Sequence, residues 1–339
     1  MNFALNRSHF VYPLLTLLLI IFFVTDVCYG TVYIPFSEIW QIMAGIEVSH
    51  GNKFIILDFR LPKALTALFA GAALSVSGLV MQTFFRNALA GPYVLGLSSG
   101  ASLGVALLVM AGSFFGGLLQ FGQWGIIIAG LLGSGFVLTM VMAASSRITD
   151  SVSLLIIGLM FGSFTSATVS LLQYFSIPEL IQSYLFWTFG SLSGIGWEQL
   201  GFMIPAVLIG LLLSFSLQKN LNLLLLGENY AVSMGLNLKT TRILIVICCS
   251  LLAGVVTSFC GPVAFLGLAV PHLTRGLFRT ADHRVLLPAT AMLGAALLLF
   301  CDICTQVPGK DITLPINALT SLIGAPVVIA IIMKRNQRL

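Results

Sequence analysis

The sequence has very little charge. Only 8% of its 339 residues are charged, whereas 58% are hydrophobic; soluble domains carry about a quarter charged residues. Water cannot solvate a surface with so few charges, so lipid is the expected solvent for most of the chain. The mean hydropathy of +1.05 agrees. The net charge of +5 does not indicate a nucleic-acid partner, because the basic residues lie in the short gaps between apolar runs.

Ionisable residues are nearly absent from the centres of the apolar runs. Asp26, Glu198 and Asp302 lie near the ends of runs. Carriers coupled to protons or sodium usually place such groups at mid-membrane, where protonation is linked to conformation. This absence argues against a secondary carrier or channel acting alone, which remains the alternative to an ATP-driven system.

Motifs for nucleotide binding and catalysis are also missing. Gly309-Lys310 is followed by Asp311 and lacks the upstream glycine that a phosphate-binding loop requires. No HExxH, GxSxG or paired carboxylate motif is present. We therefore expect a chain that is not an enzyme and that binds no cofactor or metal itself. If it drives active transport, a separate chain must hydrolyse the ATP.

Cysteine offers no disulfide framework or clear metal site. Most of the six cysteines lie inside or beside apolar runs. Cys301 and Cys304 have C-x-x-C spacing, but no second ligand pair follows. We expect both to pack as small apolar residues, with a redox or metal role as the alternative.

Long apolar runs dominate what is present. A bilayer core of about 30 Å needs about 20 apolar residues in a helix, and helices satisfy their own backbone hydrogen bonds in lipid. The sequence predicts an all-α polytopic membrane protein, a single permease domain over 1–339 with about ten spans. The runs are 10–30, 62–82, 93–112, 124–145, 152–175, 197–217, 241–260, 262–275, 285–303 and 314–333.

The eighth run is short and follows the seventh closely. Gly261-Pro262 between them marks a break, so run 262–275 is expected to be a part-span. Pro62 and Pro92 are expected where helices begin, because proline lacks the N–H that an interior helical position donates. Pro205 lies inside a run and is expected to kink it.

The basic residues indicate the orientation. With both termini in the cytoplasm, 12 of the 16 basic residues lie in inner gaps, as the positive-inside rule requires. The outer gaps hold only Lys53, Arg60, Lys63 and Lys310. All four tryptophans (Trp40, Trp124, Trp187 and Trp197) then fall at the outer side, where aromatic belts occur.

Small residues recur at four-residue spacing in two runs. Gly96, Gly100 and Gly104 form one ridge, and a second contains Gly158, Gly162 and Ser166. Such ridges let helix backbones approach closely in a membrane. Packing within one subunit is the simpler expectation; a subunit interface or a moving helix contact is the alternative.

One inner gap is unusually apolar. It extends over about 219–240, and its segment 220–235, called here the inner loop, is rich in leucine although it faces the cytoplasm. Gly227 and Gly235 are placed to end short helices. An exposed apolar segment needs a partner, and a helix held in a groove of another protein is one solution. The alternative is a loop folded back on its own bundle or on the lipid headgroups.

Several blocks resemble the FecCD-type permeases, the membrane subunits of ATP-binding-cassette importers for iron-siderophores, haem and cobalamin. Gly-Glu-Asn-Tyr-Ala at 227–231, followed by Met234-Gly235, resembles the loop that contacts the ATPase in that family. Further matching blocks are Arg60-Leu-Pro-Lys63, Gly78-Leu-Val-Met-Gln82, Arg86-Asn-Ala-Leu-Ala90, Leu95 to Ala101, Gly261 to Arg275, Asp282 to Pro288, Asp302, Leu314-Pro315 and Gly324-Ala-Pro326. They cover about 60–335 in the family's order.

The resemblance implies ten helices per subunit, a homodimer with a central path, two cytoplasmic ATPase subunits and a periplasmic binding protein, in the bacterial inner membrane. Coupling would be mechanical, with ATP closing the ATPase dimer and carrying the loop with it. Glu228 and Tyr230 are the expected contact residues within a coupling set of Leu223, Leu226, Gly227, Glu228, Tyr230, Ala231, Met234 and Gly235.

The resemblance also implies that basic residues on the outer face meet acids of the binding protein. Arg60 and Lys63 match two of these positions, although lysine replaces arginine at the second and cannot bind a carboxylate bidentately. Gln306 stands at the third position, and nearby Lys310 is a candidate substitute. Simple anchoring at the membrane interface is the alternative for Arg60 and Lys63.

The gate is expected at the inner start of the fifth span, because small hydroxyls pack closely and still tolerate a passing solute. The candidates are Thr149, Ser151 and Ser153 for the gate, and Gln173, Tyr174 and Trp187 for the outer path wall. His272 and His283 fall toward the cytoplasmic side, so structural hydrogen bonding is expected rather than haem ligation. The substrate stays open among iron chelate, haem and cobalamin, with iron-siderophores favoured as the broadest class in the family.

Overall fold

The computed structural model describes residues 2–46, 49–112, 122–147, 151–306 and 313–336. Helices account for nearly all of this part of the chain. Within it, Gln306 and Thr313 form an isolated antiparallel β-bridge. The larger helices are α1 (Asn2–Cys28), α4 (Leu61–Phe84), α5 (Leu97–Ala106), α6 (Gly122–Arg147), α7 (Ser151–Tyr174), α8 (Pro178–Thr188), α9 (Trp197–Ser216), α12 (Leu238–Cys249), α14 (Leu266–Phe278), α15 (His283–Thr305) and α16 (Ile316–Asn336).

Seven helical segments among the described residues are long and apolar enough to cross a membrane. Two shorter apolar segments, Leu97–Ala111 and Ile316–Ala330, fall on the third and tenth expected runs. The eighth run contains α14, whose 13 residues extend about 20 Å at about 1.5 Å per residue. That length is less than a bilayer core of about 30 Å. The all-helical multi-pass fold is therefore confirmed, with α14 as a part-span.

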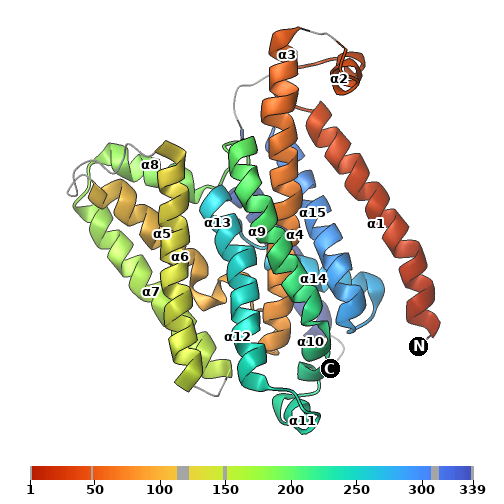
Figure 1. Cartoon of the computed structure of the whole chain (residues 1–339), viewed down its shortest axis with the longest axis vertical. Helices are drawn as coiled ribbons and strands as arrows, with labels where there is room; N and C mark the ends of the chain where they lie inside the picture. Colours follow the sequence, from red (N-terminus) through yellow and green to blue (C-terminus); the bar gives the residue numbers. More distant parts are fainter. Residues whose placement is uncertain (1, 47–48, 113–121, 148–150, 307–312, 337–339) are drawn as a thin grey trace.

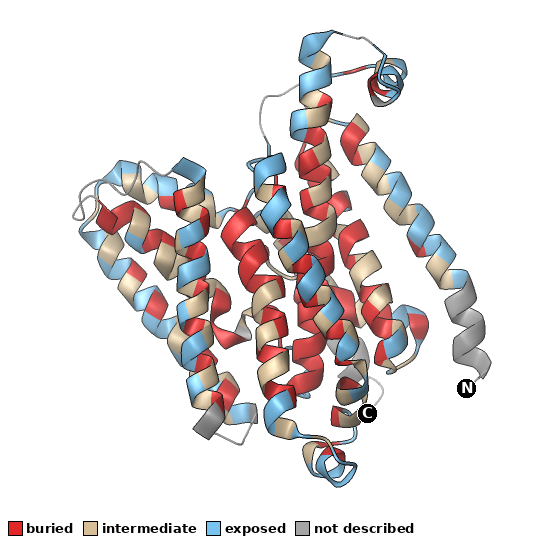
Figure 2. Cartoon of the chain, in the orientation of Figure 1, coloured by how far each residue is buried: buried red, intermediate tan, exposed pale blue. Residues whose placement is uncertain are grey.

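Helix α4 stands at the centre of the bundle. Most of its residues are buried, whereas the spanning part of α1 is largely exposed at the periphery (Figure 2). Two glycines let neighbours approach α4 closely. A Cβ on Gly71 would lie 2.4 Å from the carbonyl oxygen of Gly294 in α15, and one on Gly78 would lie 1.9 Å from that of Gly267 in α14. Helix α4 therefore packs backbone to backbone against both α14 and α15.

Pro62 lies in the first turn of α4, as expected, but the helical segment does not begin there. The helix begins at His50 with α3 (His50–Phe54), continues through a π-helical turn (η1, Ile55–Arg60) and runs into α4 without a break. In a π turn the carbonyl of Leu57 would accept from the N–H of residue 62, which proline lacks. The indole Nε1 of Trp197 donates to that carbonyl oxygen instead, at 2.9 Å. A side chain from α9 thus replaces the missing backbone donor.

The first small-residue ridge packs inside the subunit. A Cβ on Gly100 would lie 2.5 Å from the carbonyl oxygen of Gly133 in α6, and one on Gly104 would lie 2.0 Å from that of Ala129. In the second ridge, Gly162 faces Ser99 of α5, while Ser166 is exposed. The close approach of α5 to α6 therefore accounts for the first ridge.

The break after the seventh run is confirmed. Helix α13 (Val255–Cys260) ends before Gly261, which has a φ of +74°. A Cβ at Gly261 would lie 2.5 Å from the carbonyl oxygen of Trp187, so both space and conformation require glycine there. Pro205 lies inside α9, as expected.

The two ends of the bundle differ. Helices α2 (Phe36–Met43) and α3 lie at one end, and the short helices α10 (Gln218–Leu224) and α11 (Glu228–Ser233) lie at the other, where α1 begins (Figure 1). The four tryptophans belong to α2, the start of α6, the end of α8 and the start of α9. We call the end with α2 the outer end and the end with α11 the inner end.

Candidate functional site: the inner loop and the outer cluster

The inner loop is half packed and half exposed. Leu221 and Leu224 of α10 and Ala231 of α11 are buried against the bundle. Leu226, Tyr230 and Met234 are each more than half exposed. One face of the loop therefore folds back on the chain, as the alternative interpretation expected, while the other face remains uncovered. Binding of a partner to the uncovered face stays a prediction.

Two glycines shape this loop as predicted. Gly227 separates α10 from α11 with a φ of +109°, and Gly235 follows α11 with a φ of +88°. These conformations are readily available to glycine alone. They turn the chain so that α11 presents Glu228 and Tyr230 beside the end of α4.

Glu228 holds the loop to α12. Its carboxylate lies 3.5 Å from the guanidinium of Arg242, which is buried and lies over the ring of Phe84 at 6.0 Å. A cavity of about 590 Å³ lies beside Glu228 and is lined by Phe84, Phe85, Arg86, Val152 and 226–230. The inner loop therefore shares a cavity with the end of α4 and the beginning of α7, where the gate was expected.

The expected gate and path residues are only partly described. Thr149 lies outside the described residues, and the structure places Ser151 in α7 without a description of its side chain. Ser153 is half-buried in the first turns of α7. At the outer end of α7, Gln173 is half-buried and Tyr174 is largely exposed, whereas Trp187 of α8 stacks on Tyr184 at 6.2 Å.

The two histidines of the inner half make hydrogen bonds within the protein. The Nε2 atom of His272 lies 2.8 Å from the carbonyl oxygen of Ala88. The buried ring of His283 lies 2.7 Å from the side-chain oxygen of Asn222 and 2.8 Å from the hydroxyl of Thr83. The structural role expected for both histidines agrees with these contacts.

At the outer end, Arg60 caps α1. Its guanidinium donates to the carbonyl oxygens of Cys28 at 2.8 Å, of Val27 at 3.3 Å, and of Val32. A cation at a helix C-terminus satisfies carbonyls that have no helical donor and complements the helix dipole. The side chain is buried, so Arg60 fastens α1 to the η1 turn in addition to any role it has toward a binding protein.

Lys63 lies in a buried cluster with two acids, called here the outer cluster. Its ammonium lies 2.7 Å from the Asp302 carboxylate of α15 and 3.7 Å from the Asp26 carboxylate of α1. The Gln306 amide donates to Asp26 at 3.4 Å. The sequence analysis missed this grouping of two acids and one lysine. Its signal was two isolated acids and one lysine at the outer ends of three different runs.

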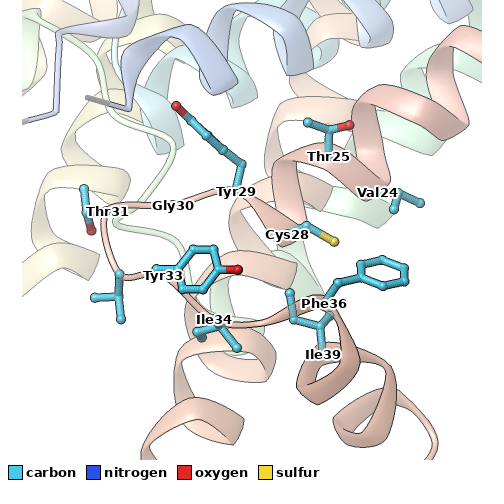
Figure 3. Close-up of a pocket in the computed structure, with 11 residues that line it drawn as sticks. Val24, Thr25, Cys28, Tyr29, Gly30, Thr31, Tyr33, Ile34, Phe36 and Ile39 are labelled. Carbon is cyan, nitrogen blue, oxygen red and sulfur yellow. The ribbon is translucent and has the colours of Figure 1, made fainter. Parts of the chain in front are cut away.

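The outer end also carries two recesses. One of about 330 Å³ is lined by residues including Arg60, Lys63, Thr305, Gln306 and Thr313, so two of the three predicted docking residues border one cavity. Lys310, the third of these residues, lies outside the described residues. The other recess, about 520 Å³, lies between the end of α1 and α2 and is lined mostly by apolar side chains such as Val24, Ile34 and Ile39 (Figure 3).

Comparison with known proteins identifies the family of this chain. The model of the FecCD transport family matches residues 18–334. The vitamin B12 import system permease protein BtuC of Klebsiella pneumoniae is 35% identical over 96% of this chain and 93% of its own length. The permease of the same name from Salmonella enteritidis is 34% identical, covering 94% of each chain.

Solved structures agree. An ABC transporter described as metal-chelate type, in an inward-facing conformation, has a TM-score of 0.83 and 33% identity over 94% of this chain and 97% of its own. PsaBC from Streptococcus pneumoniae, in complex with Fab, has a TM-score of 0.55 at 17% identity and covers 86% of this chain and 95% of its own, which shows the fold alone. The chain belongs to the FecCD transport family, as a multi-pass permease subunit of an ATP-binding-cassette importer.

Proposed function

We propose that this permease imports a large metal chelate across the bacterial inner membrane, driven by separate ATPase chains that bind the exposed face of the inner loop. The observation that carries the proposal is the division of that loop into a buried face and an uncovered apolar face. The uncovered face presents three large exposed side chains, Leu226, Tyr230 and Met234. Apolar side chains of this kind are what the groove of a partner protein binds.

The position of the loop supports mechanical coupling. The cavity beside Glu228 is bordered by Phe84 and Phe85 of the α4 end and by Val152 of α7. A displacement of α11 by an ATPase therefore acts directly on the inner ends of two spanning helices. Rigid elements in contact transmit such a displacement without any chemistry in the permease.

Helix α7 supports a path that two copies of the chain complete. Ser163, Ser166 and Ser170 are exposed and share one face of α7 with Gln173. A polar strip on a spanning helix is expected to face a water-filled path or another protein rather than lipid. One chain supplies one wall, and a second copy supplies the opposite wall. Gln173 and Tyr174 belong to this wall, and Ser153 stands near its inner end.

The smaller of the two outer recesses is the proposed docking point for a binding protein. Arg60 and Lys63 border it, although both side chains already have partners within the chain. An acidic side chain that enters the recess would therefore compete with Asp302 for Lys63. The recess is about 330 Å³, which is room for a side chain and not for a chelate.

The substrate class follows from the relatives. One curated group transports vitamin B12, a cobalt chelate, and the solved relative is described as metal-chelate type. We propose cobalamin or an iron-siderophore as the cargo. The experiment measures uptake of radio-cobalt cobalamin and radio-iron siderophores in a deletion strain, with and without the restored gene.

The same strain tests coupling. Glu228→Ala should lower the restored uptake several-fold, because it removes the carboxylate that orients α11 on Arg242. Glu198→Ala is the matched control: it makes the same change on an exposed acid at the outer start of α9. Restoration that changes uptake of neither chelate would refute the proposed cargo. Equal uptake by the two variants would refute the proposed role of Glu228.

A further inference from the structure

The short helix α10 is joined to the spanning helices by a hydrogen-bond network that the sequence analysis did not predict. Asn222 of α10 accepts through its Oδ1 atom from the backbone N–H of His283 at 2.9 Å. The same oxygen lies 2.7 Å from Nδ1 of the His283 ring. The amide nitrogen of Asn222 donates to the carboxylate of Asp282 at 2.7 Å. One side chain therefore binds the first residue of α15 and its N-cap together.

His283 continues the network into the core. Its side chain is buried, and its Nε2 atom lies 2.8 Å from the hydroxyl of Thr83, near the inner end of α4. The backbone N–H already directed at Asn222 identifies the Asn222 atom as an acceptor, so the ring proton lies on Nδ1. The Thr83 hydroxyl lies within hydrogen-bond distance of both the unprotonated Nε2 and the Leu79 carbonyl oxygen, 3.0 Å away, and its single proton serves one of these two acceptors at a time. Asn222, His283 and Thr83 thus connect three helices in one chain of contacts, called here the inner network.

Asp282 is kept ionised within this network. It also caps α15 by accepting from the backbone N–H of Arg284 at 3.0 Å. Partial burial raises the pKa of Asp282, but the hydrogen bonds from Arg284 and Asn222 outweigh burial and hold the pKa below its usual value. The acceptor for the Asn222 amide is therefore a carboxylate, which gives a stronger hydrogen bond than a neutral acceptor.

Apart from Asn220, which donates to the Thr241 hydroxyl of α12 at 2.9 Å, the rest of α10 is held by apolar packing. Leu221 and Leu224 are buried against the bundle, and packing of this kind is non-directional. Hydrogen bonds add direction, because they are lost when the partners shift by a fraction of an ångström. The inner network therefore fixes the position of α10 along α15 and α4, which leucine packing alone does not.

We propose that Asn222 is a positioning residue that makes α10 move as one body with the inner ends of α15 and α4, so that displacement of the inner loop becomes displacement of the spanning helices. The inference rests on the proposed function, in which an ATPase moves that loop. Without the network α10 would slide over the leucine contact, and hydrolysis would proceed without transport.

The test compares hydrolysis with transport in vesicles. The chain is reconstituted with the ATPase and the binding protein with which it is proposed to act. The probe is the chelate, cobalamin or iron-siderophore, that restores uptake in the deletion strain. Asn222→Leu removes the network and keeps the side-chain size. Asn220→Leu is the matched control on the same helix, since Asn220 bonds Thr241 of α12 and not α15.

Asn222→Leu should retain ATP hydrolysis within about twofold and lower uptake per ATP by about tenfold, a factor typical of coupling free energies. Asn220→Leu should leave that ratio unchanged. A second pair guards against misfolding: Asn222→Asp opposes two carboxylates and should uncouple, whereas Asn222→Asp with Asp282→Asn restores a donor and an acceptor and should recover coupling.

An unchanged ratio of uptake to hydrolysis in both Asn222→Leu and Asn222→Asp would overturn the inference. So would a parallel loss of hydrolysis and uptake in Asn222→Asp that the double variant does not repair, because the network would then only stabilise the fold. Wild-type vesicles that show no ATP-driven uptake would overturn the proposed function itself. The two failures are therefore distinguishable.

Discussion

The indole N–H of Trp197 donates to the carbonyl oxygen of Leu57, the oxygen that Pro62 leaves without a helical donor. This contact joins α9 to the π turn at the base of α3. It replaces a main-chain hydrogen bond by a bond from another helix, so we expect Trp197 and Pro62 to be energetically linked through this one oxygen.

The linkage is measurable as a double-mutant cycle. Trp197→Phe should cost about 1 kcal/mol of unfolding free energy, the usual net contribution of one hydrogen bond. In the Pro62→Ala background the restored N–H supplies the donor, so Trp197→Phe should cost clearly less. Thermal unfolding in detergent gives both values, with Trp40→Phe, an exposed tryptophan, as the control. Equal costs in the two backgrounds would show that Leu57 does not couple the residues.

The outer cluster should be sensitive to the loss of one member and tolerant of the loss of all. Lys63→Met leaves the Asp26 and Asp302 carboxylates buried without their cation, at a cost of about 3–5 kcal/mol. Changing all three, with Asp26→Asn and Asp302→Asn added, should recover most of that loss, because burying neutral amides costs much less desolvation free energy than burying unpaired carboxylates. Detergent thermal unfolding measures both variants; a triple variant no more stable than Lys63→Met would contradict this account.

Close packing at α4 predicts a strong effect of one methyl group. In Gly78→Ala the Cβ would fall 1.9 Å from the carbonyl oxygen of Gly267, so α4 and α14 must separate, at a cost of about 3 kcal/mol or more. Gly201→Ala is the control, since nothing lies within 4 Å of a Cβ there. In an exposed helix interior it should be neutral or stabilising by up to about 1 kcal/mol. Similar unfolding temperatures for the two variants would refute the contact.

The uncovered face of the inner loop predicts a separation of binding from stability. Leu226→Asn should leave the unfolding temperature unchanged, because the side chain is exposed, but should weaken association with the ATPase several-fold. Leu314→Asn makes the same change on an exposed leucine near the outer end. Titration of the purified ATPase against each variant in detergent gives the affinities. Unchanged affinity for Leu226→Asn would place the ATPase contact elsewhere.

The sequence predicts helices well here because lipid imposes them. An apolar run has few alternatives to a helix in a bilayer, so the runs at 124–145 and 197–217 fall on α6 and α9. The glycine turns at Gly227 and Gly235 are similarly local and were predicted correctly. The helix upstream of Pro62 was missed, since the donor that permits it comes from Trp197, far along the chain.

Side-chain partners were predicted poorly for a related reason. Hydropathy gives the depth of Asp26 and Asp302 but not that α1 and α15 are neighbours of the helix that carries Lys63. Nor does it distinguish Asn222, which bonds the start of α15, from Asn220, which bonds α12. Such pairings depend on which helices are neighbours and on how each helix is rotated about its axis. The hydropathy of a single apolar run gives neither.

The unbroken helix from His50 to Phe84 is longer than the membrane core is thick. Its 35 residues extend about 52 Å at about 1.5 Å per residue, some 20 Å more than the hydrocarbon core of about 30 Å. The surplus length places α3 at the outer tip of the bundle, on the same side as α2 (Figure 1). A molecule that approaches the outer end therefore meets α2 and α3 before it reaches the spanning part of α4.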